Sequence, residues 1–276
     1  MDELRADPGY AATREALQRL LASGTAPVLV YQMGKVGSTA VVAALEQAGR
    51  PVLQVHSLGE GLLDHYRKLR REGWPVPPHV HLGLALRERL KEGWPGPLQV
   101  ISLVRDPVAR EVSNCFENIR MIEAPLFDAR GRLYGEAMLR HVEAWLSREG
   151  ALGYVFSWFD RELKPSLGVD VMALPFPAER GWTVHRTPGV EVLVMQQEAL
   201  GEAGPRALQA FLGAEGPVAI PEGRRREGMR FGEVYRWVRE RLRLPRKVLE
   251  RIYASRFCTH FYSEAQRRVF LERWAA

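Results

Sequence analysis

The first strand-like segment of the chain leads through a short glycine-containing turn directly into a helix. Residues 28–32 form a compact apolar run that predicts a buried strand. Residues 39–48 have helical composition, and Gly49 is well placed to end the helix. Such a strand, turn and helix constrain the fold strongly, because this unit is typical of a parallel sheet covered by helices.

The same alternation continues along the chain. Residues 52–55 and 98–104 predict two further strands, the second being the clearest in the sequence. Helix is expected over 84–91 and again from Val108, since the preceding proline suits a first helical turn. The other expected elements are helices at 11–22, within 136–163, and at 198–212, 229–242, 245–254 and 263–274, and strands at 169–172, 182–185 and 190–195. This order predicts an α/β fold of three layers, with a central, mainly parallel sheet, helices on both faces and a helical C-terminal part.

Composition restricts the class of protein further. Hydrophobic residues make up 46% of the 276 residues and charged residues 26%, which is typical of a globular chain. No apolar run approaches the roughly 20 residues that a membrane-spanning helix requires, and the acidic N-terminal segment does not have the form of a secretory signal. Cys115 and Cys258 are too few for a disulfide framework or a cysteine-rich metal site. We therefore expect a cytoplasmic protein without a membrane span.

Most of the net charge of +6 lies near the C-terminus. Residues 222–276 hold about twice as many Lys and Arg as Asp and Glu, whereas the rest of the chain is close to neutral. A basic segment of this kind indicates an anionic partner, although arginine-rich helix faces in water would give the same composition. The run 224–226, Arg-Arg-Arg, has the same two interpretations, an acidic glycan contact or a solvated turn, and we favour the turn.

The turn at 32–39, Gln-Met-Gly-Lys-Val-Gly-Ser-Thr, has the composition of an anion-binding loop. Consecutive backbone N–H groups, with a helix N-terminus behind them, can surround a phosphate or sulfate. The two glycines permit a tight conformation, the two hydroxyl residues add donors, and Lys35 adds a point charge. The residues expected to contact the anion are Gly34, Lys35, Val36, Gly37, Ser38 and Thr39.

This loop differs from that of nucleoside triphosphatases. Their pattern, G-x-x-x-x-G-K-[ST], places a lysine directly before the hydroxyl residue, but here Lys35 lies two residues before Gly37. Asp106 is the candidate for a magnesium-binding aspartate, yet it stands between an arginine and a proline. An ordinary strand-to-helix turn is the alternative to an anion site.

A second motif follows the strand expected at 98–104. Arg105 stands at the carboxyl end of that strand, and Ser113 follows eight residues later on the next helix. With both motifs in view, the chain resembles the sulfotransferase family that uses 3′-phosphoadenosine-5′-phosphosulfate (PAPS). Residues 32–39 look like its 5′-phosphosulfate loop, and Arg105 and Ser113 look like its 3′-phosphate site. Within that family the chain is most similar to a bacterial group labelled capsular polysaccharide synthesis proteins.

The resemblance implies PAPS as co-substrate, adenosine 3′,5′-bisphosphate as product and no metal. The physical chemistry of the residues agrees, because arginine supplies a bidentate cation for a phosphate and a nearby serine adds a hydrogen bond. Lys35 is then the candidate that stabilises charge on the bridging oxygen of the leaving nucleotide. If the motif is only structural, Arg105 is an exposed charge at a strand end and Ser113 an ordinary helix residue.

The general base is less constrained by the sequence. His56 follows the second strand at its carboxyl end, where open α/β sheets bind their ligands, and its ordinary pKa of about 6.5 suits proton abstraction near neutrality. A strand-end histidine held by a backbone carbonyl is the alternative. His79, His81 or a carboxylate such as Glu117 or Glu123 are rival candidates.

One C-terminal residue completes the predicted site. The segment around Arg256 either brings a basic loop over the 3′-phosphate, as the resemblance implies, or is a packing helix with a surface arginine. Without repeats or low-complexity linkers, residues 1–276 are predicted to form one domain. An N-terminal helix occupies 1–25, a nucleotide-binding α/β core with a P-loop-type strand–loop–helix unit occupies 27–200, and a basic helical part occupies 201–276.

We therefore expect a PAPS-dependent sulfotransferase that acts on a hydroxyl acceptor, and analogy suggests a carbohydrate as that acceptor. The runner-up is a P-loop kinase or nucleotidase that uses ATP and Mg²⁺. A non-enzymatic protein that binds polyanions through its basic C-terminal quarter is a third class. No motif of a nucleic-acid-binding protein supports a nucleic acid as partner.

Overall fold

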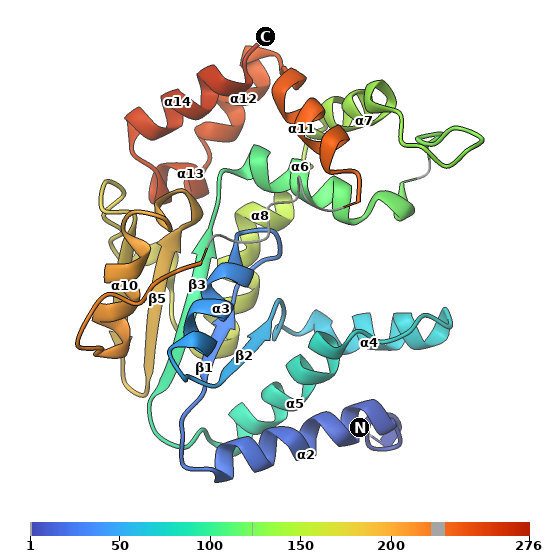
Figure 1. Ribbon diagram of the computed structural model, residues 1–276. Helices are drawn as coiled ribbons and strands as arrows, with labels where there is room; N and C mark the ends of the chain where they lie inside the picture. The colour runs from blue at the N-terminus through green and yellow to red at the C-terminus, as the bar shows by residue number, and fades with distance from the viewer. Residues whose placement is uncertain (1, 123, 222–229) are drawn as a thin grey trace.

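A five-stranded sheet forms the centre of the computed structural model, which describes residues 2–122, 124–221 and 230–276. The strands are β1 (Val28–Tyr31), β2 (Val52–Val55), β3 (Leu98–Val104), β4 (Trp182–Thr187) and β5 (Val190–Gln196). Their order across the sheet is β2-β1-β3-β5-β4, and every neighbouring pair is parallel except the β4–β5 hairpin at one edge (Figure 1). The predicted α/β fold with a mainly parallel central sheet is confirmed.

Helices connect the strands and form most of the C-terminal part. The described helices are α1 (Asp2–Arg5), α2 (Pro8–Ala22), α3 (Ser38–Gln47), α4 (Gly61–Arg71), α5 (Pro78–Glu92), α6 (Pro107–Glu117), α7 (Gly135–Ser147), α8 (Gly153–Trp158), α9 (Lys164–Leu167), α10 (Gly204–Leu212), α11 (Gly232–Arg241), α12 (Arg246–Tyr253), α13 (Arg256–Phe261) and α14 (Glu264–Trp274). Among the described residues, no helix is long and apolar enough to span a membrane.

Both faces of the sheet are covered. Gln54 of β2 donates from Nε2 to Ser38 Oγ at 2.9 Å, which places α3 on the face to which Gln54 points. The β1–β2 register pairs Tyr31 with Val55, the residue after Gln54, so Tyr31 points to the opposite face. There its ring centroid lies 5.0 Å from that of Trp158 at the end of α8. The sheet therefore lies between helices, as the sequence predicts.

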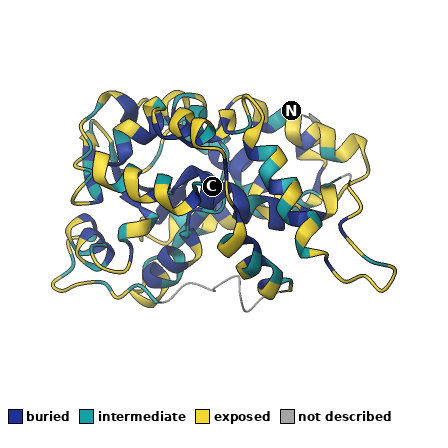
Figure 2. Ribbon diagram, turned by 90° about the horizontal axis from the view of Figure 1, so that it is seen from above, coloured by how far each residue is buried: buried dark blue, intermediate teal, exposed yellow. Residues whose placement is uncertain are grey.

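The core is a connected cluster of buried apolar side chains that extends from Leu4 to Trp274. β3 contributes heavily, because six of its seven residues are buried and it pairs with β1 on one side and β5 on the other. In the view of Figure 2, buried residues occupy the centre of the molecule and exposed ones its periphery.

Three sequence predictions of secondary structure were wrong or incomplete. Residues 169–172 do not form a strand, because the chain reverses at Gly168 (φ 72°) and then makes a single 3₁₀ turn, Val171–Ala173. The helix expected at 198–212 is split into a 3₁₀ turn and α10, which begins only at Gly204. No helix was predicted where α4 lies. Residue 229, the expected start of a helix, lies outside the described residues.

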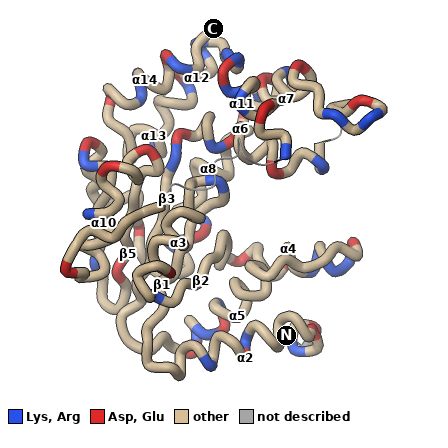
Figure 3. The backbone as a smooth tube through the Cα atoms, in the orientation of Figure 1, with Lys and Arg blue, Asp and Glu red and all other residues tan. Residues whose placement is uncertain are grey.

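Basic residues of the C-terminal helices have acidic neighbours on the same helix. Arg246 pairs with Glu250 at 3.0 Å and Arg268 with Glu264 at 3.1 Å, each across one helical turn on an exposed face. Figure 3 shows basic and acidic segments mixed over this part of the chain. This is the pattern that solvated helix faces give. The run 224–226 lies outside the described residues.

Candidate functional site

A cavity of about 700 Å³ lies at the carboxyl ends of β1, β2 and β3. The predicted residues that line it are Gly34, Lys35, Gly37, Ser38, Thr39, His56, Arg105 and Ser113, together with the rival candidates His79 and Glu117; Ala40, Gln54, Asn114 and Asn118 complete the lining. Except for Gln54 in β2, these residues come from loops and helices that follow three neighbouring parallel strands, so the sheet brings together side chains far apart in sequence.

The loop between β1 and α3 has two residues in the left-handed region. Lys35 has φ 70° and Gly37 has φ 90°. For a residue with a side chain this conformation costs about 1–2 kcal/mol, so the surrounding structure must hold Lys35 in place. Gly37 precedes α3 and provides no side chain to cap it. The Ala40 N–H bonds to the Gly37 carbonyl at 3.2 Å, so within the first turn of α3 the N–H groups of Ser38 and Thr39 are the ones that can face an anion.

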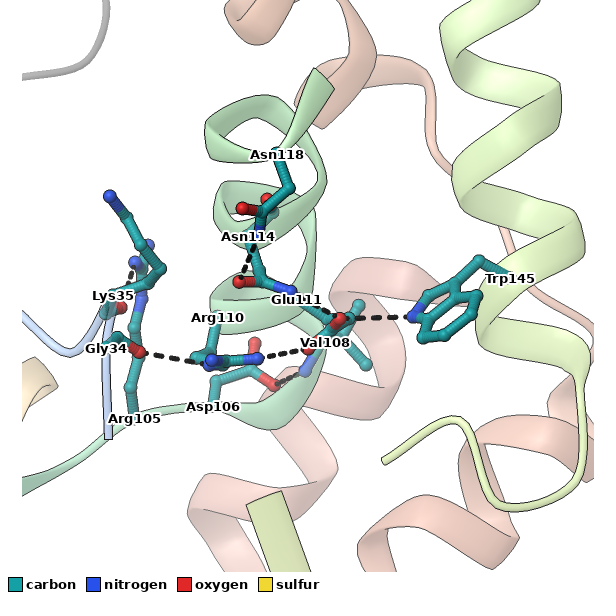
Figure 4. A network of polar contacts seen from close by, with 10 residues as sticks. All are labelled: Gly34, Lys35, Arg105, Asp106, Val108, Arg110, Glu111, Asn114, Asn118 and Trp145. Carbon is teal, nitrogen blue, oxygen red and sulfur yellow. Dashed lines mark hydrogen bonds and ion pairs between the residues drawn. The ribbon is translucent and has the colours of Figure 1, made fainter. Parts of the chain in front are cut away.

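Two arginines hold the backbone of this loop. Arg105 donates from an Nη atom to the carbonyl oxygen of Lys35 at 2.9 Å, and Arg110 donates from Nε to that of Gly34 at 3.0 Å (Figure 4). Both carbonyl oxygens, which would repel an anion, are thereby engaged by guanidinium groups. The arginines thus favour a loop conformation whose N–H groups remain available to a ligand.

Arg110 is itself held by a buried network. It is 5% exposed and forms an ion pair with Glu111, which is 3% exposed. The other oxygen of Glu111 accepts hydrogen bonds from Trp145 Nε1 at 3.1 Å and from Asn114 Nδ2 at 3.0 Å. Because every charged group in the network has a partner, the burial of both charges is compensated. The network joins α7 through α6 to the loop.

Lys35 extends its ammonium group along the cavity wall. Its Nζ lies 2.8 Å from Glu117 Oε2 on α6, and the two side chains are 26% and 52% exposed. Partial exposure screens this ion pair and makes it weak. The ammonium can therefore exchange its partner for a more highly charged ligand.

Ser38 is arranged to donate into the cavity. Its Oγ accepts the hydrogen bond from Gln54 Nε2, so the hydroxyl proton remains available to another acceptor. Ser113, on α6, is only 5% exposed, and its side chain also lines the cavity. Among the described residues, the Nε atom of Arg105 is buried without a hydrogen-bond partner. One guanidinium donor at this site is thus unused by the protein.

His56 has a defined tautomer in this structure. Its Nδ1 lies 3.0 Å from the carbonyl oxygen of Gln32. Because a carbonyl oxygen only accepts, we assign the proton of the neutral ring to Nδ1, which leaves Nε2 as a proton acceptor. Burial is the main cause that lowers the pKa of His56 below 6.5, and the positive charges of Lys35 and Arg110 lower it further. The ring is therefore neutral at pH 7.

The rival candidates for the base separate into two groups. His79 and Glu117 line the same cavity, and the rings of His79 and His56 lie 5.5 Å apart. His81 is buried elsewhere, with Nε2 3.4 Å from Asp7 Oδ1. Glu123 lies outside the described residues.

Two predicted residues do not bring a side chain to the cavity. The side chain of Val36 is fully buried in the core, so only its backbone could contact a ligand. Arg256, at the start of α13, pairs with Asp160 at 3.2 Å and is not among the residues that line the cavity. The ion pair with Asp160 agrees with the alternative in which Arg256 is a surface arginine on a packing helix.

Asp106 has a structural environment. It is 2% exposed, and its carboxylate accepts hydrogen bonds from the Val108 N–H at 3.0 Å, the Tyr253 hydroxyl at 2.9 Å and Trp274 Nε1 at 2.8 Å. Burial raises the pKa of this carboxyl group, against the opposing effect of these three donors. Since its acceptor positions face the backbone and the C-terminal helices, Asp106 is badly placed to hold a magnesium ion.

Sequence reasoning missed Arg110, Gln54, Asn114 and Asn118. Arg110 and Glu111 are adjacent opposite charges between the apolar residues 108–109 and Val112. Such a pair between apolar residues of a helix is a signal of a buried ion pair, because unpaired charges are seldom fully buried. Gln54 lies two residues before His56 on the strand that leads to the site, but nothing in its local sequence marks its contact with Ser38.

Comparison with known proteins gives one partial match. Residues 149–263, less than half of the chain, match a family model described as "Putative capsular polysaccharide synthesis protein". This confirms the predicted similarity to that group over the segment from α8 to α13. The matched segment contains Arg256 but not the loop at 32–39, Arg105 or Ser113. No curated protein and no solved structure matched the chain.

Proposed function

We propose that the protein is a sulfotransferase that moves the sulfuryl group of PAPS to a hydroxyl group, with a saccharide as the acceptor. The observation that carries the proposal is the shared cavity. It brings the anion-binding loop together with Arg105 and Ser113, which lie about 70 residues further along the chain. Two neighbouring groups of anion-binding residues in one cavity suit a nucleotide phosphorylated at both its 5′ and 3′ positions. A volume of about 700 Å³ is within the range of cofactor sites.

Different groups of the protein bind the two charged ends of the nucleotide. The backbone N–H groups of the loop and the hydroxyls of Ser38 and Thr39 hold the 5′-phosphosulfate end. Arg105, which is only partly buried, offers its remaining Nη donors to the 3′-phosphate, and Ser113 adds a hydroxyl donor to the same group. Charge on both phosphates is thus balanced by side chains and the N-terminus of α3.

The transfer step needs a leaving-group cation and a base. Lys35 gives up its exposed contact with Glu117 and donates to the oxygen that bridges sulfur and the 5′-phosphate. As the bond from that oxygen to sulfur breaks, the oxygen keeps the electron pair and Lys35 stabilises its charge. His56 Nε2 takes the proton of the acceptor hydroxyl while the new oxygen–sulfur bond forms.

The kinase alternative is disfavoured by specific contacts. The lysine that nucleoside triphosphatases place directly before the hydroxyl residue is missing, because Gly37 precedes Ser38. The sole aspartate suggested for Mg²⁺, Asp106, is occupied by three donors from the protein. A non-enzymatic polyanion binder is not favoured either, since the C-terminal arginines described above pair with acidic neighbours.

Calorimetric titration tests the proposed nucleotide site. Adenosine 3′,5′-bisphosphate and 5′-AMP differ only in the 3′-phosphate, so the ratio of their affinities measures how well that group is recognised. In Arg105→Ala this ratio should fall about 30-fold or more, because loss of a charged partner from an enclosed ligand typically costs about 2–5 kcal/mol. Affinity for 5′-AMP should fall by a smaller factor, because Arg105 also holds the loop through the Lys35 carbonyl.

Arg186→Ala is the matched control, since Arg186 is an exposed arginine on the edge strand β4 that pairs with Glu191. It should bind both nucleotides as the unmodified protein does. If Arg105→Ala lost the same factor of affinity for both nucleotides, Arg105 would be shown to support the loop through Lys35 without recognising the 3′-phosphate. Failure of the unmodified protein to prefer the bisphosphate would overturn the proposed function.

A further inference from the structure

A second cavity, of about 500 Å³, lies against a neighbouring face of helix α6. It is bounded by α6 and α7, and it shares two lining residues, Asn114 and Asn118, with the cavity that holds the anion-binding loop. We call it the α6–α7 cavity. Because Asn114 and Asn118 line both cavities, the two cavities are adjacent, and a molecule in one can extend toward a molecule in the other.

The main feature of the α6–α7 cavity is a positioned aromatic ring. Trp145 of α7 donates from Nε1 to Glu111 Oε1 at 3.1 Å, which fixes the orientation of its indole. The side chain is only partly buried, so it can offer apolar surface to a ligand. Glu111 adds little negative charge to the cavity, since the buried guanidinium of Arg110 neutralises it.

A cation accompanies the ring. The guanidinium carbon of Arg148 lies 5.7 Å from the centroid of the Trp145 ring. Arg148 is exposed, and among the described residues it has no ion-pair partner. His141, four residues before Trp145 on α7, lines the same cavity. A planar apolar surface, one uncompensated cation and two amide side chains therefore converge next to the candidate site.

We propose that the α6–α7 cavity binds the acceptor, and that this acceptor is an oligosaccharide that contains hexuronate residues. The proposal rests on the proposed function, because it needs a saccharide that reaches the neighbouring cavity. The apolar face of a sugar ring packs on the indole of Trp145, and the amides of Asn114 and Asn118 hydrogen-bond its hydroxyls. Arg148 forms a bidentate contact with the carboxylate.

The chemistry favours an acidic sugar over a neutral one. Arginine that lies over an aromatic ring keeps several N–H donors free at the edge of its plane, and these match a carboxylate in geometry and charge. A neutral saccharide could use the indole and the amides but would leave the charge of Arg148 unpaired. The cavity should therefore discriminate by charge as well as by shape.

Saccharide binding to the full chain, saturated with adenosine 3′,5′-bisphosphate, tests this assignment. The probes are tetrasaccharides of galacturonate, of mannuronate and of alternating glucuronate and N-acetylglucosamine, with maltotetraose as the neutral comparison. Calorimetry should detect at least one acidic tetrasaccharide at an affinity about ten-fold or more above that of maltotetraose, the effect expected of one charged hydrogen-bonded contact. Arg148→Gln should remove this preference.

Arg140→Gln is the control, because Arg140 lies on α7 before Trp145, is 70% exposed and pairs with Glu136 outside the cavity. It should retain the preference. Trp145→Ala should weaken the binding of acidic and neutral saccharides alike, since both pack on the indole ring. The assignment is overturned if protein that binds the bisphosphate binds no acidic tetrasaccharide, or if Arg148→Gln and Arg140→Gln behave alike. Failure of the unmodified protein to bind the bisphosphate would instead refute the proposed function.

Discussion

Lys35 combines two properties that bear on how the site works. Its backbone lies in the left-handed region, and its ammonium is paired with Glu117 across the cavity. The backbone conformation is held by the bond from Arg105 to the Lys35 carbonyl, whereas the side-chain pair is partly exposed and weak. At this residue the loop is fixed while the charged group can change its partner. This arrangement suits a lysine that must reach a leaving group.

Exchange of Lys35 between Glu117 and the nucleotide leads to a prediction about binding. Glu117→Gln removes both the competitor for Lys35 and a negative charge that faces an anionic ligand. Affinity for adenosine 3′,5′-bisphosphate should therefore rise, by about two- to five-fold if the pair has the strength usual for exposed ion pairs. Calorimetry measures the change, and a weaker affinity would show that Glu117 helps to hold the nucleotide.

Assignment of the base leads to a second prediction. His56→Ala should reduce the transfer of radiolabelled sulfate to a glycan pool by about 10²–10⁴-fold, the usual contribution of general base catalysis. Nucleotide affinity, measured on the same preparation, should be retained, because His56 is assigned to the acceptor proton. Glu117→Gln is the matched comparison within the cavity and should keep most of its transfer rate. Near-normal transfer in His56→Ala would give the role to His79 or Glu117.

The pH dependence of the unmodified protein follows from the same residue. His56 accepts a proton only when it is neutral, and its pKa is lowered from 6.5 by burial and by nearby positive charges. The rate at low substrate concentration should therefore rise with pH through a pKa below 6.5 and be level between about pH 7 and pH 8. A profile that is still rising above pH 7 would contradict the assignment of the base.

At the scale of elements, Asp106 joins the sheet to the C-terminal helices. It caps the N-terminus of α6 directly after β3, and it accepts hydrogen bonds from Tyr253 of α12 and Trp274 of α14. The same short segment thus supplies Arg105 to the candidate site and Asp106 to the core. The geometry of this segment therefore depends on helices that come from the end of the chain.

Removal of this contact should destabilise the whole protein. Asp106→Ala leaves three buried donors without an acceptor, so we expect a loss of about 3 kcal/mol or more in the free energy of unfolding. Denaturant titration followed by circular dichroism measures it. Asp64→Ala, at a carboxylate on α4 that is 81% exposed, should cost less than about 0.5 kcal/mol. Similar stabilities for the two variants would show that the Asp106 contacts contribute little.

Elements with strong local signals were predictable from the sequence. β2 and β3 have the predicted bounds, because each is a short apolar run between turn residues. α4 was not predicted, since most of its surface is polar and only Leu62 and Tyr66 are buried. At 169–172 the error was the opposite, because a strand was predicted where the chain forms a turn. The apolar residues Val169, Val171 and Met172 are buried, but by a turn that packs on neighbouring helices.

At the scale of the whole molecule, the site residues that were predicted are mainly those at the ends of parallel strands. Parallel strands bring their carboxyl ends to one edge of the sheet, so Lys35, His56 and Arg105 could be grouped from their positions in sequence alone. No comparable rule predicts from sequence which distant helices will be in contact. The link from Trp145 to Glu111, the α6–α7 cavity and the position of Arg256 beside Asp160 all depend on tertiary packing.

Thermal unfolding with a panel of nucleotides tests the central claim most directly. In the presence of a metal chelator, adenosine 3′,5′-bisphosphate at 100 times its dissociation constant should stabilise the protein by about 2.7 kcal/mol. That corresponds to a rise of about 5 °C or more in melting temperature, larger than the rise produced by 5′-AMP or by ATP at the same concentration. A greater rise with ATP and Mg²⁺ than with the bisphosphate would contradict the account and favour a kinase or nucleotidase.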